Sequence, residues 1–408
     1  MIHRLITAGL LAMCLAGCST SLEKQGNSFS EQAAQIARTS IIVDTHIDVP
    51  YRLSVRPDDV SQATEKGDFD YPRAVVGGLN APFMSIYTPA SLELRGESKA
   101  KADKLIDSVE DIVKQAPDKF AIALSTADVR EHFERGIISL PLGMENGSPI
   151  EGDLANVEHF YDRGIRYLSL SHGESNHLSD SSYDDNRPWK GLSDTGKAVI
   201  AEMNRLGIMV DVSHLSDRAF WDALEVTKTP VIASHSSARY FTPGWERNMS
   251  DEMIAALVEN GGVVQINFGS MFLTREALEY TKARSEARKA WQLEHQDVSD
   301  TDLYVTYAAI YAEERGPFPY ATVDDVLDHI DHVVSIAGID HVGIGSDYDG
   351  VGDALPAGLK DVSGYPNLIA GLLGRGYSEE DIRKILGENL LRVWKAAEVY
   401  AATTSSST

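Results

Sequence analysis

Eight short apolar runs alternate along this chain with stretches whose apolar residues have helical spacing. Strands separated by helices pair in parallel, and eight such units close into a barrel. We therefore expect an α/β fold of the (β/α)8 TIM-barrel type. An open doubly wound sheet is the main alternative, and it is disfavoured because no Gly-x-Gly-x-x-Gly motif follows any run. The runs cover residues 41–48, 80–88, 138–145, 165–172, 208–214, 230–236, 263–269 and 341–349.

The interval between the seventh and eighth runs is unusually long, at about seventy residues. A loop of that length without structure of its own is rare in a compact domain. Residues 275–315 are highly charged and helical in composition. We expect a helical insertion between the seventh and eighth strands. It would serve as a lid over the barrel or as a contact between two copies of the chain in a homodimer.

The first residues have the layout of a secretory signal. Arg4 precedes an apolar run over residues 5–16, which is too short to span a bilayer stably. The run ends Leu15-Ala16-Gly17-Cys18-Ser19, which resembles the lipobox of bacterial lipoproteins. The resemblance implies cleavage before Cys18 and acylation of that cysteine. An ordinary signal peptide, or a buried apolar helix, with an incidental cysteine is the alternative.

The lipobox interpretation sets the expected division of the chain and its location. We expect a signal peptide over residues 1–17, a lipidated tether over 18–35, one barrel domain over 36–400 and a disordered tail over 401–408. The protein would be lipid-anchored to the bacterial membrane in the cell envelope, facing an extracytoplasmic compartment. If sorting follows the pattern of Gram-negative lipoproteins, Ser19 in place of Asp favours the outer membrane.

The net charge and the cysteine content exclude two classes of site, one for nucleic acid and one built from thiolates. The formal net charge of −24 argues against nucleic acid as a partner, because phosphates demand a basic face. Cys14 and Cys18 are the only cysteines, so the barrel domain has no disulfide and no thiolate site. A metal in that domain has to be held by histidines and carboxylates.

Potential metal ligands gather at the carboxyl ends of the expected strands. The first run ends in His46-Ile47-Asp48, and residues two apart in a strand point to the same side. Barrel enzymes keep their active sites at this rim, so the strand-end residues would meet there. Histidines in helical or loop stretches, such as His132 and His329, are expected to be solvated. The strand-end set is His46, Asp48, Glu145, His172, His214, His235 and Asp347.

The residue types in this set indicate the chemistry. Imidazole nitrogen and carboxylate oxygen without cysteine suit hydrolytic zinc, with manganese, iron and cobalt as alternatives. Five ligands are too many for one tetrahedral ion that keeps an open position, but they suit two ions about 4 Å apart that share one carboxylate. Such a pair lowers the pKa of a bridging water and polarises a carbonyl, so it can hydrolyse an amide at neutral pH.

These residues and their surroundings resemble the membrane (renal) dipeptidases, zinc peptidases of the amidohydrolase-like barrel class. The resemblance extends from about residue 41 to residue 399 and consists of ordered motifs at family-like spacing. The motifs are DTHID (44–48), GMENG (143–147), RYLSLSH (166–172), DVSH (211–214), SHS (234–236), RNM (247–249), HVGIGSDYDG (341–350) and NLLR (389–392).

The resemblance implies a role for each ligand. His46 and Asp48 would bind the first of two zinc ions, and His214 and His235 the second. Glu145 is similar to the family carboxylate that bridges both ions.

The resemblance also implies roles beyond metal binding. His172 would contact the substrate and stabilise the oxyanion of the tetrahedral intermediate. Asp347 resembles the acid/base carboxylate that handles the proton of the bridging water. Arg247 matches the arginine that binds the carboxylate of the dipeptide, a role suited to its bidentate fork.

Taken together, these features predict a metal-dependent dipeptidase. Its substrates would be L-Xaa-L-Xaa and L-Xaa-D-Xaa dipeptides, cut by a hydroxide that bridges two zinc ions. One alternative is a hydrolase with the same site that acts on another small amide, lactam or ester. The other is a surface-binding lipoprotein without catalysis, which would not need Asp347 and His172 beside an intact ligand set.

Overall fold

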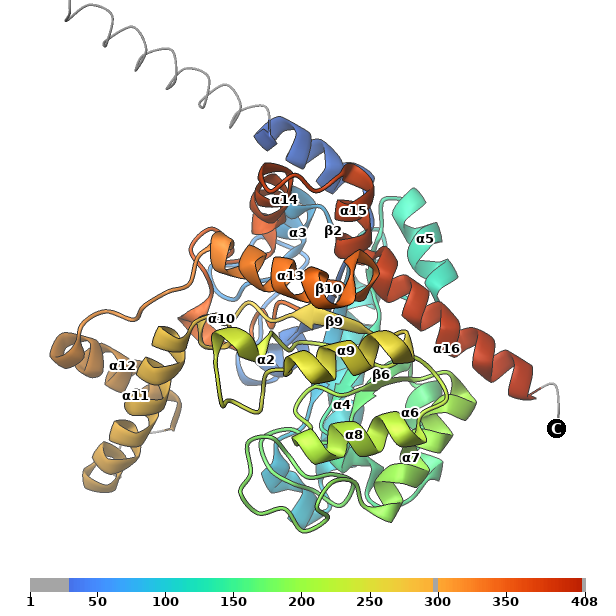
Figure 1. Ribbon diagram of the computed structural model, residues 1–408, viewed down its shortest axis with the longest axis horizontal. Coiled ribbons are helices and arrows are strands. Elements are labelled where there is room, and N and C mark those ends of the chain that lie inside the picture. Colours follow the sequence, from blue (N-terminus) through green and yellow to red (C-terminus); the bar gives the residue numbers. More distant parts are fainter. Residues whose placement is uncertain (1–28, 296–299, 406–408) are drawn as a thin grey trace, which may run out of the picture.

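Eight parallel strands form a nearly closed barrel, which confirms the predicted fold (Figure 1). Neighbouring strands pair in chain order, and the last meets the first where Asp48 N donates to Tyr348 O at 2.9 Å and Asp347 N to His46 O at 3.0 Å. The strands are β1 (Ile42–Ile47), β2 (Leu79–Tyr87), β5 (Leu142–Glu145), β6 (Ile165–Ser169), β7 (Met209–Asp211), β8 (Ile232–Ala233), β9 (Val263–Ile266) and β10 (Val342–Ile344).

Helices follow the strands and surround the barrel in this computed structural model, which describes residues 29–295 and 300–405. Cys18 and the expected signal peptide 1–17 lie outside the described residues. The helices are α2 (Val49–Val55), α3 (Tyr71–Gly77), α4 (Ser98–Gln115), α5 (Thr126–Glu134), α6 (Ala155–Asp162), α7 (Asp194–Leu206), α8 (Asp217–Val226), α9 (Asp251–Asn260), α10 (Ser270–Leu273), α11 (Arg275–Glu294), α12 (Asp300–Arg315), α13 (Val323–Ala337), α14 (Tyr365–Gly374), α15 (Glu379–Arg383) and α16 (Asn389–Ser405).

Serine N-caps start three consecutive barrel helices. Ser193, Ser216 and Ser250 each accept a hydrogen bond from the backbone N–H three residues later, at the start of α7, α8 and α9. Each such cap satisfies a backbone donor that the helix itself leaves unpaired. The helices therefore begin at defined points just after the loops that carry the site residues.

Side chains alternate between the inside of the barrel and its helical coat, as the two-residue period of a strand requires. In β9, Val263 packs in the inner cluster and Val264 in the outer one. The inner cluster also contains Leu390 and Trp394 of α16. Helix α16 thus packs against the starts of the strands, and the opposite rim is left open for a site.

The expected third strand, 138–145, proved to be two strands. Pro141 has no backbone N–H to give to a ladder, and the run divides there. The first part, β4 (Ile138–Leu140), pairs with β3 (Phe120–Ile122) in a separate two-stranded sheet, and only β5 enters the barrel.

The predicted insertion between the seventh and eighth strands is present. Helices α10, α11 and α12 precede α13, which returns the chain to β10. In Figure 1, α11 and α12 extend to the left of the barrel. Their position beside the rim makes α11 available to the site.

The two ends of the described chain are helical. Residues 29–39 form a helix whose Ala33 and Ile36 are buried in the core, so folded structure begins within the segment expected as a tether. Helix α16 continues through Ser405, into the expected disordered tail. Among the described residues, no helix has the length and apolar content that crossing a membrane requires.

Candidate metal centre

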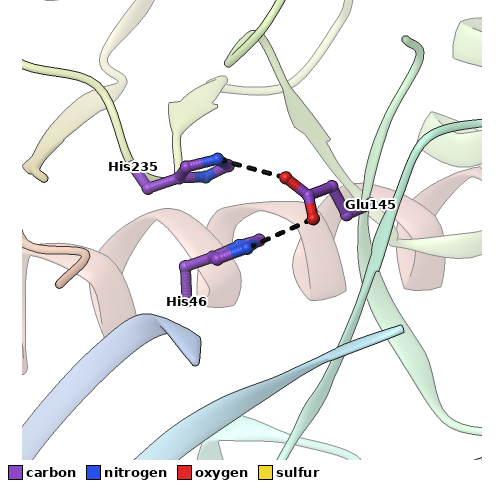
Figure 2. Close-up of side chains that lie close together, drawn as sticks. All are labelled: His46, Glu145 and His235. Carbon is purple, nitrogen blue, oxygen red and sulfur yellow. Dashed lines mark ion pairs between the residues drawn. The ribbon is translucent and has the colours of Figure 1, made fainter. Parts of the chain in front are cut away.

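Glu145, the last residue of β5, faces His46 and His235 through its two carboxylate oxygens (Figure 2). Its Oε1 lies 3.0 Å from His214 Nε2 and 3.3 Å from His235 Nε2, and its Oε2 lies 3.5 Å from His46 Nε2. The His214 and His235 Nε2 atoms are 2.8 Å apart. One carboxylate therefore contacts histidines from β1 and from the loops after β7 and β8.

A second group of ligand atoms forms around His46. Asp48 Oδ2 lies 3.5 Å from His46 Nε2, so the two residues do share one side as their spacing predicts. Asp347, which follows β10, joins them, with its ligand atom within 4.8 Å of theirs. The group lies where β1 meets β10, beside the Glu145 cluster.

The outer nitrogens of two histidines are held by hydrogen bonds. His46 Nδ1 lies 2.8 Å from the Tyr167 hydroxyl, and His235 Nδ1 lies 2.7 Å from Ser234 Oγ. Ser234 Oγ in turn donates to Asp211 Oδ2 at 2.6 Å. These bonds orient both rings so that Nε2 faces Glu145, the usual support of metal-binding histidines.

The backbone at the rim is strained where it presents site residues. His214 and Asp347 have φ angles of 68° and 65°, in the left-handed region that non-glycine residues rarely occupy. Next to them, Gly350 packs between two carboxylates: a Cβ there would lie 2.2 Å from Asp347 Oδ1 and 2.3 Å from Asp48 Oδ2. Only glycine fits this position.

Burial and neighbouring charges determine the ionisation of the cluster. Burial alone would raise the pKa of Glu145, but the imidazoles of His46 and His172 hold it well below its usual value. Burial and the Arg247 guanidinium hold the pKa of His214 well below its usual value, and burial and His46 do so for the pKa of His235. An ionised carboxylate thus faces the neutral imidazoles of His214 and His235, while Tyr167, Glu145 and Asp48 raise the pKa of His46 against the effect of its burial. Metal binding at His46 would therefore release a proton.

The donor set fits divalent metal. Buried ligand atoms with no hydrogen-bond partner among the described residues include His46 Nε2 and Asp48 Oδ1. Unpaired buried polar atoms are costly, and a cation at this position would pair them. Nitrogen and oxygen donors without sulfur match hydrolytic metals.

His172, in the loop after β6, lies beside the cluster. His172 Nε2 is 3.6 Å from Glu145 Oε1, and its ring contacts those of Tyr87 and His214 with centroids 4.7 Å and 4.3 Å away. Burial lowers its pKa. The imidazole is half-buried and borders the cavity described below.

Asp347 is a buried carboxylate on the other side of Glu145. Burial raises its pKa to about 8, and the carboxylates of Asp48 and Glu145 add to that rise while His46 opposes it. Asn267 Nδ2 donates to Asp347 Oδ2 at 2.8 Å. The carboxyl group is therefore held in place by Asn267.

Arg247 follows β8 and lies against His214 and His235. Its guanidinium donates to Ser236 Oγ at 2.7 Å and to His235 O at 2.8 Å, and NH2 lies 3.1 Å from His214 Nε2. The side chain is only 2 % exposed, and its Nε has no hydrogen-bond partner among the described residues. Tyr183 also hydrogen-bonds to it. A buried guanidinium with donor capacity to spare is suited to an anionic ligand.

A cavity of about 700 Å³ opens above the cluster. Asp48, Glu145, His172 and Asp347 line its floor, and Thr281 and Arg284 of α11 line it from the insertion. This size is ordinary for a small-molecule site. The insertion therefore forms part of the pocket wall, as expected of a lid.

Comparison with known families decides what kind of protein carries this centre. The family model of the membrane dipeptidases (peptidase family M19) matches residues 30–408. The chain belongs to the membrane dipeptidase family. It is therefore a metal-dependent dipeptidase of (β/α)8 fold.

Individual proteins similar to this membrane dipeptidase support the family assignment. An uncharacterized dipeptidase of Schizosaccharomyces pombe is 32% identical over 409 residues, covering 95% of this chain and 88% of the relative. The probable dipeptidase PvdM of Pseudomonas aeruginosa has a TM-score of 0.79 at 26% identity, covering 92% of this chain and 100% of that one. A metallopeptidase of Rhodobacter sphaeroides, liganded with a phosphinate mimic of L-Ala-D-Ala, has a TM-score of 0.71 at 26% identity, covering 88% and 99%.

Sequence reasoning missed the supporting residues of this dipeptidase. Tyr167 lies inside the RYLSLSH motif and Asp211 begins the DVSH motif. Each lies a few positions before a site histidine, and this closeness in sequence could have identified both. Asn267, at the end of the seventh run, and Arg284, in the insertion, carried no motif at all. Only the folded chain places them beside the site.

Two histidines expected to be solvated are buried. His329 of α13 accepts a hydrogen bond from Ala238 N at Nδ1 and lies 3.0 Å from Leu273 O through Nε2. Burial lowers its pKa to about 4. His132 is also buried and contacts Ser139 Oγ at 2.9 Å. Through these contacts His329 joins α13 to the segments after β8 and β9, and His132 joins α5 to β4.

Proposed function

We propose that this chain hydrolyses L-Xaa-L-Xaa and L-Xaa-D-Xaa dipeptides with two zinc ions held by His46, Asp48, Glu145, His214 and His235. The observation that carries the proposal is the convergence of the three imidazole Nε2 atoms on one buried carboxylate. Zinc bound there would lower the pKa of a water shared between the ions, supplying hydroxide, and would polarise the scissile carbonyl.

Three side chains around the cluster have the remaining catalytic and substrate-binding roles. His172 donates a hydrogen bond to the oxyanion that develops on the scissile carbonyl. Asp347 accepts a proton from the attacking water and passes it to the leaving amine. Cations held at the neighbouring ligands would lower its raised pKa and favour the carboxylate form that accepts the proton. Arg247 binds the C-terminal carboxylate through its fork.

Recognition through the carboxylate also bears on stereochemistry. A guanidinium that holds the carboxylate does not read the side chain of the C-terminal residue, so either configuration can be accepted there. The Rhodobacter sphaeroides metallopeptidase with its mimic of L-Ala-D-Ala supports this choice of substrate.

Arg247 provides the test of the dipeptide assignment. We expect the wild type to cut a free dipeptide and to reject its C-terminal amide and the matching tripeptide. Both rejected substrates would put a neutral group against a buried guanidinium, which costs several kcal/mol, or a few orders of magnitude in kcat/KM. Arg247→Ala should lower kcat/KM for the dipeptide by a similar factor. Steady-state kinetics on the three substrates measures both effects.

Arg218→Ala is the matched control, because Arg218 is an exposed arginine that pairs with Asp222 on α8. It should leave all three rates near those of the wild type. Equal efficiency of the wild type on dipeptide, amide and tripeptide would contradict both the arginine role and the dipeptidase assignment.

We further propose that the protein is lipid-anchored through Cys18 in the bacterial cell envelope, at the outer membrane. Two or three acyl chains give stable attachment where one gives only marginal binding. Cys18→Ser, expressed in the host, is expected to appear in the soluble fraction or in the wrong compartment. Fractionation and intact-mass measurement check this, with Ser21→Ala as the control. An unmodified Cys18, or cleavage elsewhere, would contradict the proposal.

A further inference from the structure

A second cavity adjoins the catalytic one beneath the insertion. Its volume is about 510 Å³, and its lining shares Arg284, Val351, Gly352 and Ala354 with the catalytic cavity. The two cavities therefore adjoin along this shared wall. The second cavity lies between α11 and α12 on one side and the loop after β10 on the other.

Aromatic rings form the walls of this second cavity, which we call the aromatic pocket. The rings of Tyr280 and Phe318 meet edge to face at 5.4 Å, and those of Phe318 and Tyr320 at 4.9 Å. Both tyrosine hydroxyls are engaged elsewhere: Tyr280 donates to Gly316 O at 2.9 Å and Tyr320 to Asp353 Oδ2 at 2.5 Å. Both hydroxyls are therefore satisfied by the protein, and the pocket presents ring surfaces together with the Asp353 carboxylate.

Arg284 stands at the junction of the two cavities. Its guanidinium lies over the Tyr280 and Phe318 rings, 5.8 Å and 5.5 Å from their centroids. A cation at the junction repels a basic side chain and attracts the face of an aromatic one. The rings and this cation thus match the pocket to an aromatic group.

The direction of the substrate follows from Arg247. That arginine lies against His214 and His235, on the β7 and β8 side of the metal centre. The aromatic pocket opens near Val351, in the loop after β10. The Asp347 group, which begins the loop after β10, lies with His46 and Asp48 rather than with His214. A dipeptide whose carboxylate reaches Arg247 and whose amide lies over Glu145 would therefore place its N-terminal residue on the side of that loop.

We propose that the aromatic pocket is the subsite for an aromatic side chain on the N-terminal residue of the dipeptide. This inference rests on the proposed dipeptidase function and specifies its substrate class. The dipeptidase prefers L-Phe-L-Ala to L-Ala-L-Ala and gains nothing comparable from L-Ala-L-Phe, whose ring lies at the other end.

The test fills the pocket from α12. Ala312 lines it, whereas Ala309 on the same helix is exposed. With the zinc-loaded full chain, the wild type should show a kcat/KM for L-Phe-L-Ala at least about tenfold above that for L-Ala-L-Ala. Ala312→Trp should lower the L-Phe-L-Ala value by about tenfold and leave L-Ala-L-Ala within about twofold. Ala309→Trp should change neither.

Phe318→Ala tests the same pocket in the opposite steric sense, by removing a wall. It too should reduce the preference for L-Phe-L-Ala, whereas a loss of folding would lower both rates together and show in circular dichroism. If both dipeptides are hydrolysed and neither variant changes the ratio of kcat/KM for L-Phe-L-Ala to that for L-Ala-L-Ala, the subsite is overturned. The proposed function is then unaffected. Hydrolysis of neither by the wild type would overturn the proposed function and the subsite with it.

Discussion

Glu145→Gln is expected to remove most of the bound metal and to abolish dipeptide hydrolysis. The carboxylate contacts the ligand nitrogens of His46, His214 and His235, so both ions would lose a negatively charged ligand in one substitution. The amide has nearly the same shape, which keeps the packing, but only one oxygen and no charge. Elemental analysis of the purified wild type should approach two metals per chain, and the variant should fall well below one.

His46→Ala is the informative comparison, because it removes a ligand from one side only. It should lose less metal than Glu145→Gln. Glu151→Gln is the control, since Glu151 is an exposed glutamate a few residues along the same loop and should keep full metal content. A wild-type stoichiometry that stays at or below one after reconstitution with zinc would contradict the two-ion proposal.

Asp347→Asn is expected to keep the metal and to lower turnover by about two to four orders of magnitude, the usual contribution of a positioned acid/base. Asparagine retains the volume and can still meet Asn267, but it cannot accept and return a proton. Measuring kcat together with metal content separates this role from a ligand role. Loss of metal in the variant would make Asp347 a ligand, as its place near His46 and Asp48 allows.

Asp349 is the neighbouring carboxylate against which this assignment is judged. Both of its oxygens already accept hydrogen bonds, from Arg52 Nε at 2.8 Å and from Asp68 N at 2.7 Å. Asp349→Asn is therefore expected to lower thermal stability more than kcat. Near-normal turnover in Asp347→Asn, with a large loss in a folded Asp349→Asn, would transfer the proton role to Asp349.

Much of the candidate site could be predicted because its information is local. His46 and Asp48 follow an apolar run directly, and Glu145 ends another, so the residue type and the strand end are read within a few positions. Closure of parallel strands into a barrel then brings all carboxyl ends to one rim. The clustering of His214 and His235 on Glu145 follows from that rule and from short loops.

Other features depend on contacts that no local pattern encodes. Pro141 marks where the run 138–145 divides, but only the folded chain decided that Ile138–Leu140 would pair with Phe120–Ile122 outside the barrel. His329 looked like an ordinary helical histidine, yet α13 packs it against Ala238 and Leu273. Whether His329 is buried depends on the residues that pack against it, and those residues lie far away in the sequence.

By itself, then, the sequence determined the barrel, its insertion and the strand-end residues that form the candidate metal centre. The apolar periodicity of a strand or helix can be recognised within a short stretch of sequence, and so can the polar residues that end a strand. Only the tertiary structure decided that Tyr167 and Asn267 hold His46 and Asp347, and that α11 brings Arg284 and an aromatic pocket to the catalytic cavity. Those pairings join residues separated by tens to hundreds of positions, and they exist only once packing has selected one arrangement of the elements.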